Sequence, residues 1–233
     1  MEYCAAEGIP VLPRGGGTSL AGQTVNEAVV LDFKKEMDAV IDVDPKAATV
    51  TAQPGITLAR LNDQIEAHGL KYAPDPAWGD KSVLGGCIGN NSTGAHSLKY
   101  EKADGYLEAV EVVLADGTVT TFDWMTVDEL HERAETAAAA DNPGIEARIY
   151  EVVSKIIRNQ TAEINARYPD LMRNVSGYNF DKLLEDAEGG RVNVGRLLAG
   201  SEGTLGIVTQ ATVSLEPIPA ETSVVLLTYD DVI

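Results

Sequence analysis

The stretch Pro10–Gln23, PVLPRGGGTSLAGQ, joins a short apolar run to three consecutive glycines, Gly15–Gly17. Glycine adopts positive φ freely and has no side chain, so the backbone N–H groups around it can approach a ligand closely. Consecutive N–H groups that point into one concavity bind anions such as a pyrophosphate. One such cluster alone is more often a tight turn. Two further clusters, Gly85–Gly94 and Gly200–Gly206, also stand at expected strand ends, and the three together favour a phosphate-binding site.

The two common nucleotide-binding patterns do not fit this stretch. Counted from Gly17, the P-loop pattern requires a lysine where Gln23 stands, and that cation neutralises the β- and γ-phosphates. Counted from Gly15 and Gly17, the Rossmann pattern GxGxxG requires a glycine where Leu20 stands. Asp32 is near the distance expected of a ribose-binding carboxylate, but it follows a strand rather than a helix. The sequence therefore predicts neither an NTPase nor a Rossmann fold.

Bulk properties narrow the possible functions. The 233 residues include 18 basic and 36 acidic ones, and the formal net charge of −18 makes an acidic surface that repels nucleic acid. No apolar run approaches the roughly 18 residues of a membrane-spanning helix, and the N-terminus does not resemble a secretion signal. The two cysteines and three histidines have no metal-ligand spacing, so no metal site is predicted. We expect a cytoplasmic protein.

Strand-like runs outnumber helical ones and do not alternate with them regularly, which predicts an α+β fold. Strands are expected at 9–12, 28–33, 39–43, 48–53, 107–114, 118–122 and 207–215, with a hairpin turn at Asp116-Gly117. Thr57 is expected to cap a helix that ends at Gly69, and a longer helical region is expected from 126 to 168. A last strand is expected over Ser223–Tyr229. Because only four residues follow it, we expect the chain to be part of a longer protein.

The first glycine-rich stretch, together with LGGCIGNNSTGAHS (84–97) and GSEGTLGIVT (200–209), resembles the FAD-binding domain of the vanillyl-alcohol oxidase (PCMH-type) superfamily. The order and spacing of the motifs agree over residues 5–220. The form GNNS-x-GAHS is similar to FAD-linked dehydrogenases of D-2-hydroxy acids (D-lactate, D-2-hydroxyglutarate and glycolate), many of which carry a C-terminal iron–sulfur domain. Thr93 stands where those relatives usually have cysteine, and Glu101 replaces a usual glycine. These departures leave the substrate open.

The resemblance implies a PCMH-type fold in which two α+β subdomains clasp FAD. Residues 1–75 would form the first subdomain, truncated at its N-terminus, 76–220 the second, and 221–233 would begin a missing cap domain that binds substrate. The cofactor-binding residues that it implies are Pro13, Arg14, Gly15, Gly16, Gly17, Thr18, Ser19, Leu20, Pro76, Val83, Gly85, Gly86, Gly89, Asn90, Thr93, Gly94, Glu202, Gly206, Ile207 and Val208. The first loop has no histidine for a covalent link, so non-covalent FAD is implied. His96 either faces the flavin or is structural, and Arg14 either binds the phosphates or pins the loop.

The implied reaction transfers hydride from the α-carbon of a 2-hydroxy acid to the flavin and leaves a 2-keto acid. A cation must hold the substrate carboxylate and a base must take the hydroxyl proton. Neither stands in a recognisable motif, so the catalytic residues are unknown and are expected in the cap domain. The electron acceptor would be a quinone or an iron–sulfur domain. Two alternatives stay open: an NADPH-dependent reductase of the same fold, and a non-catalytic flavin electron-transfer module.

Overall fold

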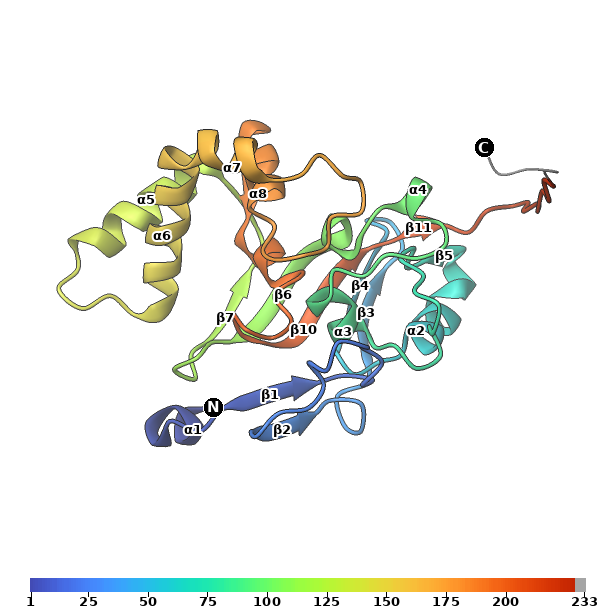
Figure 1. Cartoon of the computed structure of the whole chain (residues 1–233), viewed down its shortest axis with the longest axis horizontal. Coiled ribbons are helices and arrows are strands. Elements are labelled where there is room, and N and C mark those ends of the chain that lie inside the picture. The colour runs from blue at the N-terminus through green and yellow to red at the C-terminus, as the bar shows by residue number, and fades with distance from the viewer. Residues whose placement is uncertain (229–233) are drawn as a thin grey trace.

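A five-stranded antiparallel sheet forms the centre of the computed structural model, which describes residues 1–228 (Figure 1). In spatial order its strands are β3 (Val40–Asp44), β4 (Thr49–Ala52), β10 (Ile207–Ser214), β6 (Leu107–Val113) and β7 (Val119–Phe122). Strands from both sides of residues 75 and 76 thus share one sheet. The expected boundary between two subdomains at that point stays a prediction.

The buried face of this sheet follows from the two-residue period of its strands. Val110 and Val112 of β6 are buried, as are Ala211 and Val213 of β10. Register shifts between β10 and β6 lie at residues 208–210 and 212–213, and the first of them interrupts the alternation of buried residues in β10. Each buried valine contributes roughly 1.5–3 kcal/mol to stability by leaving water. The pairing of β6 with β7 confirms the hairpin expected around Asp116-Gly117.

Helix α2 (Leu58–Ile65) confirms the cap expected at Thr57. The Thr57 hydroxyl accepts a hydrogen bond from Arg60 N at 3.4 Å, which satisfies one of the N–H groups that the first turn leaves free. The chain continues through η1 (Glu66–His68) and turns at Gly69. The buried residues of α2 lie on one face and pack into the core: Leu58, Leu61 and Ile65.

Three two-stranded sheets lie around the central one. They are β1 (Val11–Arg14) with β2 (Val29–Asp32), β5 (Leu70–Lys71) with β11 (Glu216–Pro217), and β8 (Trp124–Thr126) with β9 (Arg191–Asn193). The β1–β2 pair is parallel, and the loop between its strands holds the first glycine-rich stretch. With α1 (Glu2–Glu7), this pair lies to one side of the five-stranded sheet, in blue in Figure 1. The α+β class is confirmed, and the described strands do not have the repeated βαβ order of a Rossmann fold.

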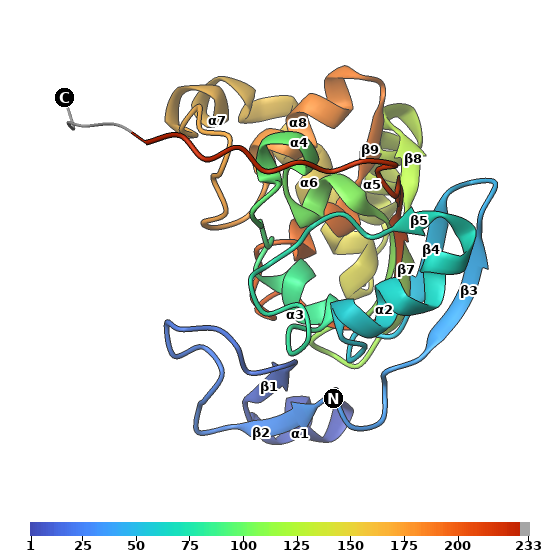
Figure 2. The same cartoon turned by 90° about the vertical axis from the view of Figure 1, so that its right-hand side faces the viewer.

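The remaining helices lie mostly in the second half of the chain. They are α3 (Leu84–Gly89), α4 (Ser97–Tyr100), η2 (Ala103–Tyr106), α5 (Val127–Ala139), α6 (Ile145–Asn159), α7 (Thr161–Arg167), α8 (Phe180–Glu188) and η3 (Val194–Leu198). Helices α5 to α8 gather at one end of the molecule, away from β1 and β2 (Figures 1 and 2). Thr126 and Glu129 form a capping box that starts α5. None of the helices described for residues 1–228 is both long enough and apolar enough to cross a membrane.

The strand expected over Ser223–Tyr229 is wrong for residues 223–228, which have no regular secondary structure; Tyr229 lies outside the described residues. A strand requires a neighbour that pairs with its backbone N–H and C=O groups. Within residues 1–228 no strand lies beside this segment, and Val224 and Leu226 are 97% and 86% exposed. The apolar composition was therefore a poor guide to secondary structure here.

Candidate functional site

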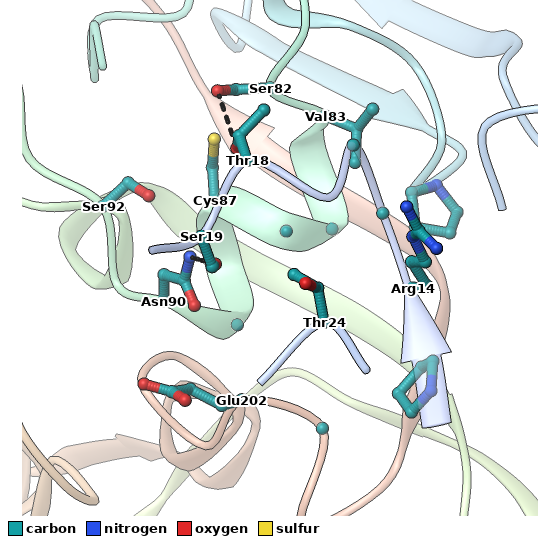
Figure 3. Close-up of a pocket in the computed structure, with 18 of the residues that line it drawn as sticks. Arg14, Thr18, Ser19, Thr24, Ser82, Val83, Cys87, Asn90, Ser92 and Glu202 are labelled. Atoms are coloured by element: carbon teal, nitrogen blue, oxygen red, sulfur yellow. Dashed lines mark hydrogen bonds between the residues drawn. The ribbon is translucent and has the colours of Figure 1, made fainter. Parts of the chain in front are cut away.

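Three glycine-rich segments, the first (10–23), second (84–97) and third (200–209), meet around a cavity of about 470 Å³ (Figure 3). This volume lies within the roughly 300–1,000 Å³ that is usual for small-molecule sites. The first segment contributes the loop after β1, the second contributes α3 and the turn after it, and the third contributes the loop before β10. Segments that are far apart in sequence thus build one site.

The glycines of the first segment let its loop pack tightly on residues 81–83. A Cβ atom on Gly15 would lie 2.5 Å from Val83 Cγ2, and one on Gly16 would lie 2.2 Å from the backbone oxygen of Lys81. Both distances are shorter than real Cβ contacts, so a side chain at either position would displace the loop. Packing of the loop on Lys81 and Val83 therefore requires glycine at these two positions.

Arg14 and free backbone N–H groups give this loop the character of an anion site. Within residues 1–228, no N–H group of residues 15–19 donates a hydrogen bond to a backbone carbonyl. Gly17 has a φ of +65°, and the Arg14 guanidinium lies over it, with Nη2 3.0 Å from the position of a Cβ atom. Among the lining residues of the described chain, Arg14 is the one basic residue. It both lies against the loop and lines the cavity.

Helix α3 of the second segment carries three glycines whose surroundings differ. A Cβ atom on Gly85 would lie 2.5 Å from Pro54 Cβ, so packing against the protein requires glycine there. Cβ atoms on Gly86 and Gly89 would have their nearest protein atoms at 3.5 Å and 3.8 Å, which are ordinary contacts. All three glycines line the cavity. A side chain at position 86 or 89 would therefore occupy part of the cavity and would not collide with the protein.

Polar side chains join the first and second segments. Asn90 Nδ2 donates a hydrogen bond to Ser19 Oγ at 2.9 Å, and the hydroxyls of Thr18 and Ser82 lie 3.4 Å apart (Figure 3). The same wall holds Cys87, whose thiol has its pKa raised by burial to about 12. The thiol is therefore protonated at neutral pH, and this wall of the cavity carries hydroxyl, amide and thiol groups without charge.

The third segment closes the end of α3. Gly200 N donates to Ile88 O at 3.1 Å, and Glu202 N donates to Gly89 O at 2.9 Å. These bonds satisfy two carbonyls that the last turn of a helix leaves free. The Glu202 side chain lies across the cavity from Thr18 and Ser82 in Figure 3. The second and third segments are thus joined through the backbone and share one wall.

The structure brings most of the predicted cofactor-binding residues together at this cavity. Those that line it are Pro13, Arg14, Gly15, Gly16, Gly17, Thr18, Ser19, Leu20, Pro76, Val83, Gly85, Gly86, Gly89, Asn90, Glu202, Gly206 and Val208. Three others, Thr93, Gly94 and Ile207, do not line it. Contact with a cofactor stays a prediction for each of them.

The three residues outside the cavity have physical reasons to be there. Ile207 begins β10 between Gly206 and Val208, and because strand side chains alternate, it points to the opposite face and is buried. Gly94 packs on Asp75, whose Oδ1 would lie 2.0 Å from a Cβ atom on the glycine. Thr93 is half-buried beside it. The residues after Asn90 therefore leave the cavity sooner than the motif suggested, although Ser92 still lines it.

His96 also lies outside the cavity lining. Its Nδ1 atom is 2.5 Å from Asp75 Oδ2, and its side chain is exposed. The ring of Tyr100 lies beside it, with the two ring centres 6.5 Å apart. Of the two roles that the sequence left open, these contacts favour the structural one.

The sequence missed a second set of lining residues. They are Gln23, Thr24, Phe33, Pro54, Ala77, Trp78, Ser82, Cys87, Ser92, Leu198, Ser201 and Gly203. Cys87, Ser92, Ser201 and Gly203 lie inside the quoted motifs, and their positions alone could have identified them. Phe33, Pro54 and Trp78 reach the cavity only because distant elements pack together, and no local pattern marks them.

Comparisons with known proteins agree with this geometry. A family model described as "FAD binding domain" matches residues 1–123. D-2-hydroxyglutarate dehydrogenase of Escherichia coli (strain K12) is 31% identical over 94% of the chain. Glycolate oxidase subunit GlcD of Bacillus subtilis (strain 168) is 31% identical over all of the chain. D-lactate dehydrogenase of Archaeoglobus fulgidus is 30% identical over 98% of the chain. The chain spans only 21%, 37% and 38% of the lengths of these three relatives.

A solved structure, alkyldihydroxyacetonephosphate synthase, has the same fold. It superposes on 94% of the chain with a TM-score of 0.57 and 20% sequence identity, and the match covers 32% of that protein. At this identity the likeness concerns the fold alone.

Proposed function

Because the chain belongs to the family of FAD binding domains, we propose that it is the FAD-binding part of an enzyme that oxidises a 2-hydroxy acid to a 2-keto acid. FAD is the cofactor of this family. Relatives at 30–31% identity that are named dehydrogenases or oxidases of D-2-hydroxyglutarate, glycolate and D-lactate support the substrate class. The convergence of the three glycine-rich segments on one cavity is the observation that carries the proposal.

The chemistry of the lining residues supports FAD as the ligand. The free N–H groups of residues 15–19, the Arg14 guanidinium and the hydroxyls of Thr18 and Ser19 would hold the pyrophosphate. Pro76, Val83, Gly85 and Gly86 would line the ribityl and flavin channel, and Gly89 and Asn90 would reach the phosphates. Glu202, Gly206 and Val208 would form the adenine–ribose end. When bound, FAD supplies the redox chemistry, and these residues bind and orient it.

We propose that the cofactor is held without a covalent bond. Within residues 1–228 no histidine is among the lining residues, and His96 is held by Asp75 instead. Cys87 lines the cavity, but its pKa of about 12 keeps the thiol protonated and therefore a poor nucleophile.

Both cysteines of the described chain are free thiols. Free thiols are usual in a reducing compartment, which supports a cytoplasmic location.

We assign substrate binding and proton transfer to parts of the relatives' length that this chain does not span. Among the lining residues of the described chain, Arg14 is the one cation, and it is committed to the loop. In this division, residues 1–75 and 76–220 would clasp FAD. Correct positioning of a substrate lowers the reaction barrier by roughly 7–11 kcal/mol, so without the substrate-binding part the rate would be too low to detect. A quinone or an iron–sulfur domain would accept the electrons.

Anaerobic mixing tests this division. We expect that the FAD-loaded 233-residue chain is not bleached by D-lactate, D-2-hydroxyglutarate or glycolate, whereas the full-length gene product is bleached rapidly by one of them. Rapid bleaching of the 233-residue chain alone would show that the catalytic groups lie within it. Bleaching of the full-length product by NADPH and by none of the hydroxy acids would favour a reductase of the same fold.

A further inference from the structure

Two buried asparagines lie just behind the wall that the second and third segments share. Asn91 is 0% exposed and Asn179 is 5% exposed, and Asn91 Nδ2 donates a hydrogen bond to Asn179 Oδ1 at 3.3 Å. Neither residue is among those that line the cavity. A buried carboxamide is costly unless its oxygen and its N–H groups find partners, so a satisfied pair fixes the segments that carry it.

The remaining bonds of this pair reach the backbone on both sides of the shared wall. Asn91 stands between Asn90 and Ser92, which both line the cavity, and its Oδ1 accepts a hydrogen bond from Asp104 N at 3.0 Å. Asn179 Nδ2 donates to Ala199 O at 2.9 Å. Ala199 immediately precedes the third segment, so the pair joins the second segment to the start of the third.

Each of these two segments contains a residue other than glycine with a positive φ. Asn91 has a φ of +48° and Glu202 a φ of +51°, in the left-handed region that asparagine tolerates better than most residues and that glutamate rarely adopts. Such conformations persist where the surroundings over-determine them, and they concentrate at ligand sites. The Asn91–Asn179 bond, with the bond from Asn179 Nδ2 to Ala199 O, holds the turn at Asn91 against the residue that precedes the third segment.

A buried ion cluster stands behind the pair. Arg196 Nη1 lies 2.5 Å and 2.6 Å from the two carboxylate oxygens of Asp186, and its Nη2 lies 3.3 Å from Asp104 Oδ2. Lys102 Nζ lies 3.8 Å from Asp104 Oδ1 and donates to Asn174 O at 3.0 Å. The two positive and two negative charges balance, and removal of one would leave a buried charge without its partner. The cluster anchors Asp104, whose N–H group holds Asn91.

We infer that the Asn91–Asn179 pair, backed by the Asp104–Arg196–Asp186 cluster, is a positioning element that holds the second and third segments in the geometry that binds FAD. These residues act through Asn90, Ser92 and Glu202 rather than by touching the cofactor. The inference rests on the proposed FAD site. It predicts that loss of the pair weakens FAD binding by more than loss of an equally buried carboxamide elsewhere.

Asn193 provides that matched control. It is also 0% exposed, its Nδ2 donates to Leu107 O at 3.2 Å and to Glu108 O at 2.9 Å, and its Oδ1 accepts from Gly195 N at 2.9 Å. These bonds join β6 to the start of η3, and none reaches the three glycine-rich segments. Asn193→Ala and Asn179→Ala therefore remove similar buried bonds in different places.

The experiment measures the melting temperature of the apoprotein and the Kd for FAD of each variant. We expect both alanine variants to melt earlier, but only Asn179→Ala to raise the Kd, by about 10-fold or more, and to change the visible circular dichroism of the bound flavin. Asn91→Gly keeps a positive φ without strain and removes only the carboxamide, so it tests the same bond if Asn179→Ala fails to fold. Combined with Asn179→Ala, it should raise the Kd by less than the product of the two single effects, because the bond between the two side chains is lost in both variants.

Each other result overturns the inference. A Kd within about twofold of wild type in Asn179→Ala or Asn91→Gly would show that the pair does not position the site. An equal rise in Kd for Asn193→Ala would show that any loss of stability weakens binding. The wild-type chain is measured first: if it binds no FAD, the proposed function fails instead, and the variants are not needed to show it.

Discussion

The first and second glycine-rich segments line the same cavity, but different neighbours make glycine necessary in each. In the first segment, Gly15 and Gly16 face Val83 and Lys81 so closely that any side chain would collide with the protein. In the second segment, Gly86 and Gly89 have only ordinary contacts around the position of a Cβ atom and face the cavity. Glycine therefore serves protein packing at positions 15 and 16 and leaves room for a ligand at positions 86 and 89.

This difference separates two effects that a motif cannot distinguish. A substitution in the first segment should move the loop itself, whereas one at the cavity side of α3 should leave the fold intact and compete only with the ligand. Adjacent Gly85 and Gly86 repeat the contrast within one helix, because Gly85 packs on Pro54 and Gly86 does not. The comparison is thus testable with single substitutions.

The largest expected difference is in the reactivity of the two cysteines. Burial raises the pKa of Cys87, in the second segment, to about 12, so almost none of this thiol is ionised at pH 8, and only the thiolate reacts with an alkylating reagent. We expect iodoacetamide to label Cys4, which is only half-buried, and to label the buried Cys87 at a rate about 1,000-fold lower. The thiolate fraction of Cys87 grows only as pH rises toward 12. Equal labelling of both in the folded protein would contradict the burial of the α3 wall.

Gly16→Val should reduce FAD affinity by about 100-fold or more. The new side chain would overlap the backbone oxygen of Lys81, so the loop must move away from Lys81, and we expect its N–H groups to lose their common direction. Gly105→Ala serves as the control, because a Cβ atom there meets no protein atom within 4 Å. Fluorescence titration with FAD measures both. Wild-type affinity in Gly16→Val would show that the loop does not bind the cofactor.

Gly86→Ala and Gly85→Ala should separate binding from stability. Gly86→Ala adds a methyl group on the cavity side of a helix, so we expect a melting temperature no lower than wild type and a Kd for FAD raised by about 10-fold. Gly85→Ala adds its methyl group 2.5 Å from Pro54 Cβ and should destabilise the apoprotein by about 1–3 kcal/mol. If the two variants exchange these phenotypes, the cavity side of α3 has been misassigned.

The smallest expected effect lies just beyond the second segment, at Glu101. This exposed residue has a φ of +54° and a ψ of −128°, a conformation that glycine adopts without strain. We expect Glu101→Gly to stabilise the protein by about 1 kcal/mol, seen as a rise of roughly 2–4 °C in melting temperature. Glu101→Ala keeps a Cβ atom and should give no such gain. Equal melting temperatures of the two variants would show that the strain has another cause.

The sequence predicted the fold class, the β6–β7 hairpin, the α2 cap at Thr57 and most residues around the cavity, because each leaves a local pattern. What depends on distant packing left no such pattern. Gly94, which the motif assigned to the ligand, packs against Asp75, and Ile207 lies on the face of β10 that is turned away from the cavity, so their contact with a cofactor stays a prediction. Trp78 and Phe33 carry no motif and join the lining only through tertiary contacts. The buried Asn91–Asn179 bond spans 88 residues and has no signature in either segment.

Titration of FAD into the 233-residue wild-type chain, followed by acid denaturation and filtration, tests most directly whether the three segments form one non-covalent flavin site. We expect saturable binding of one FAD per chain, with all of the flavin passing through the filter after denaturation. No saturable binding, or flavin retained with the precipitated protein, would contradict it.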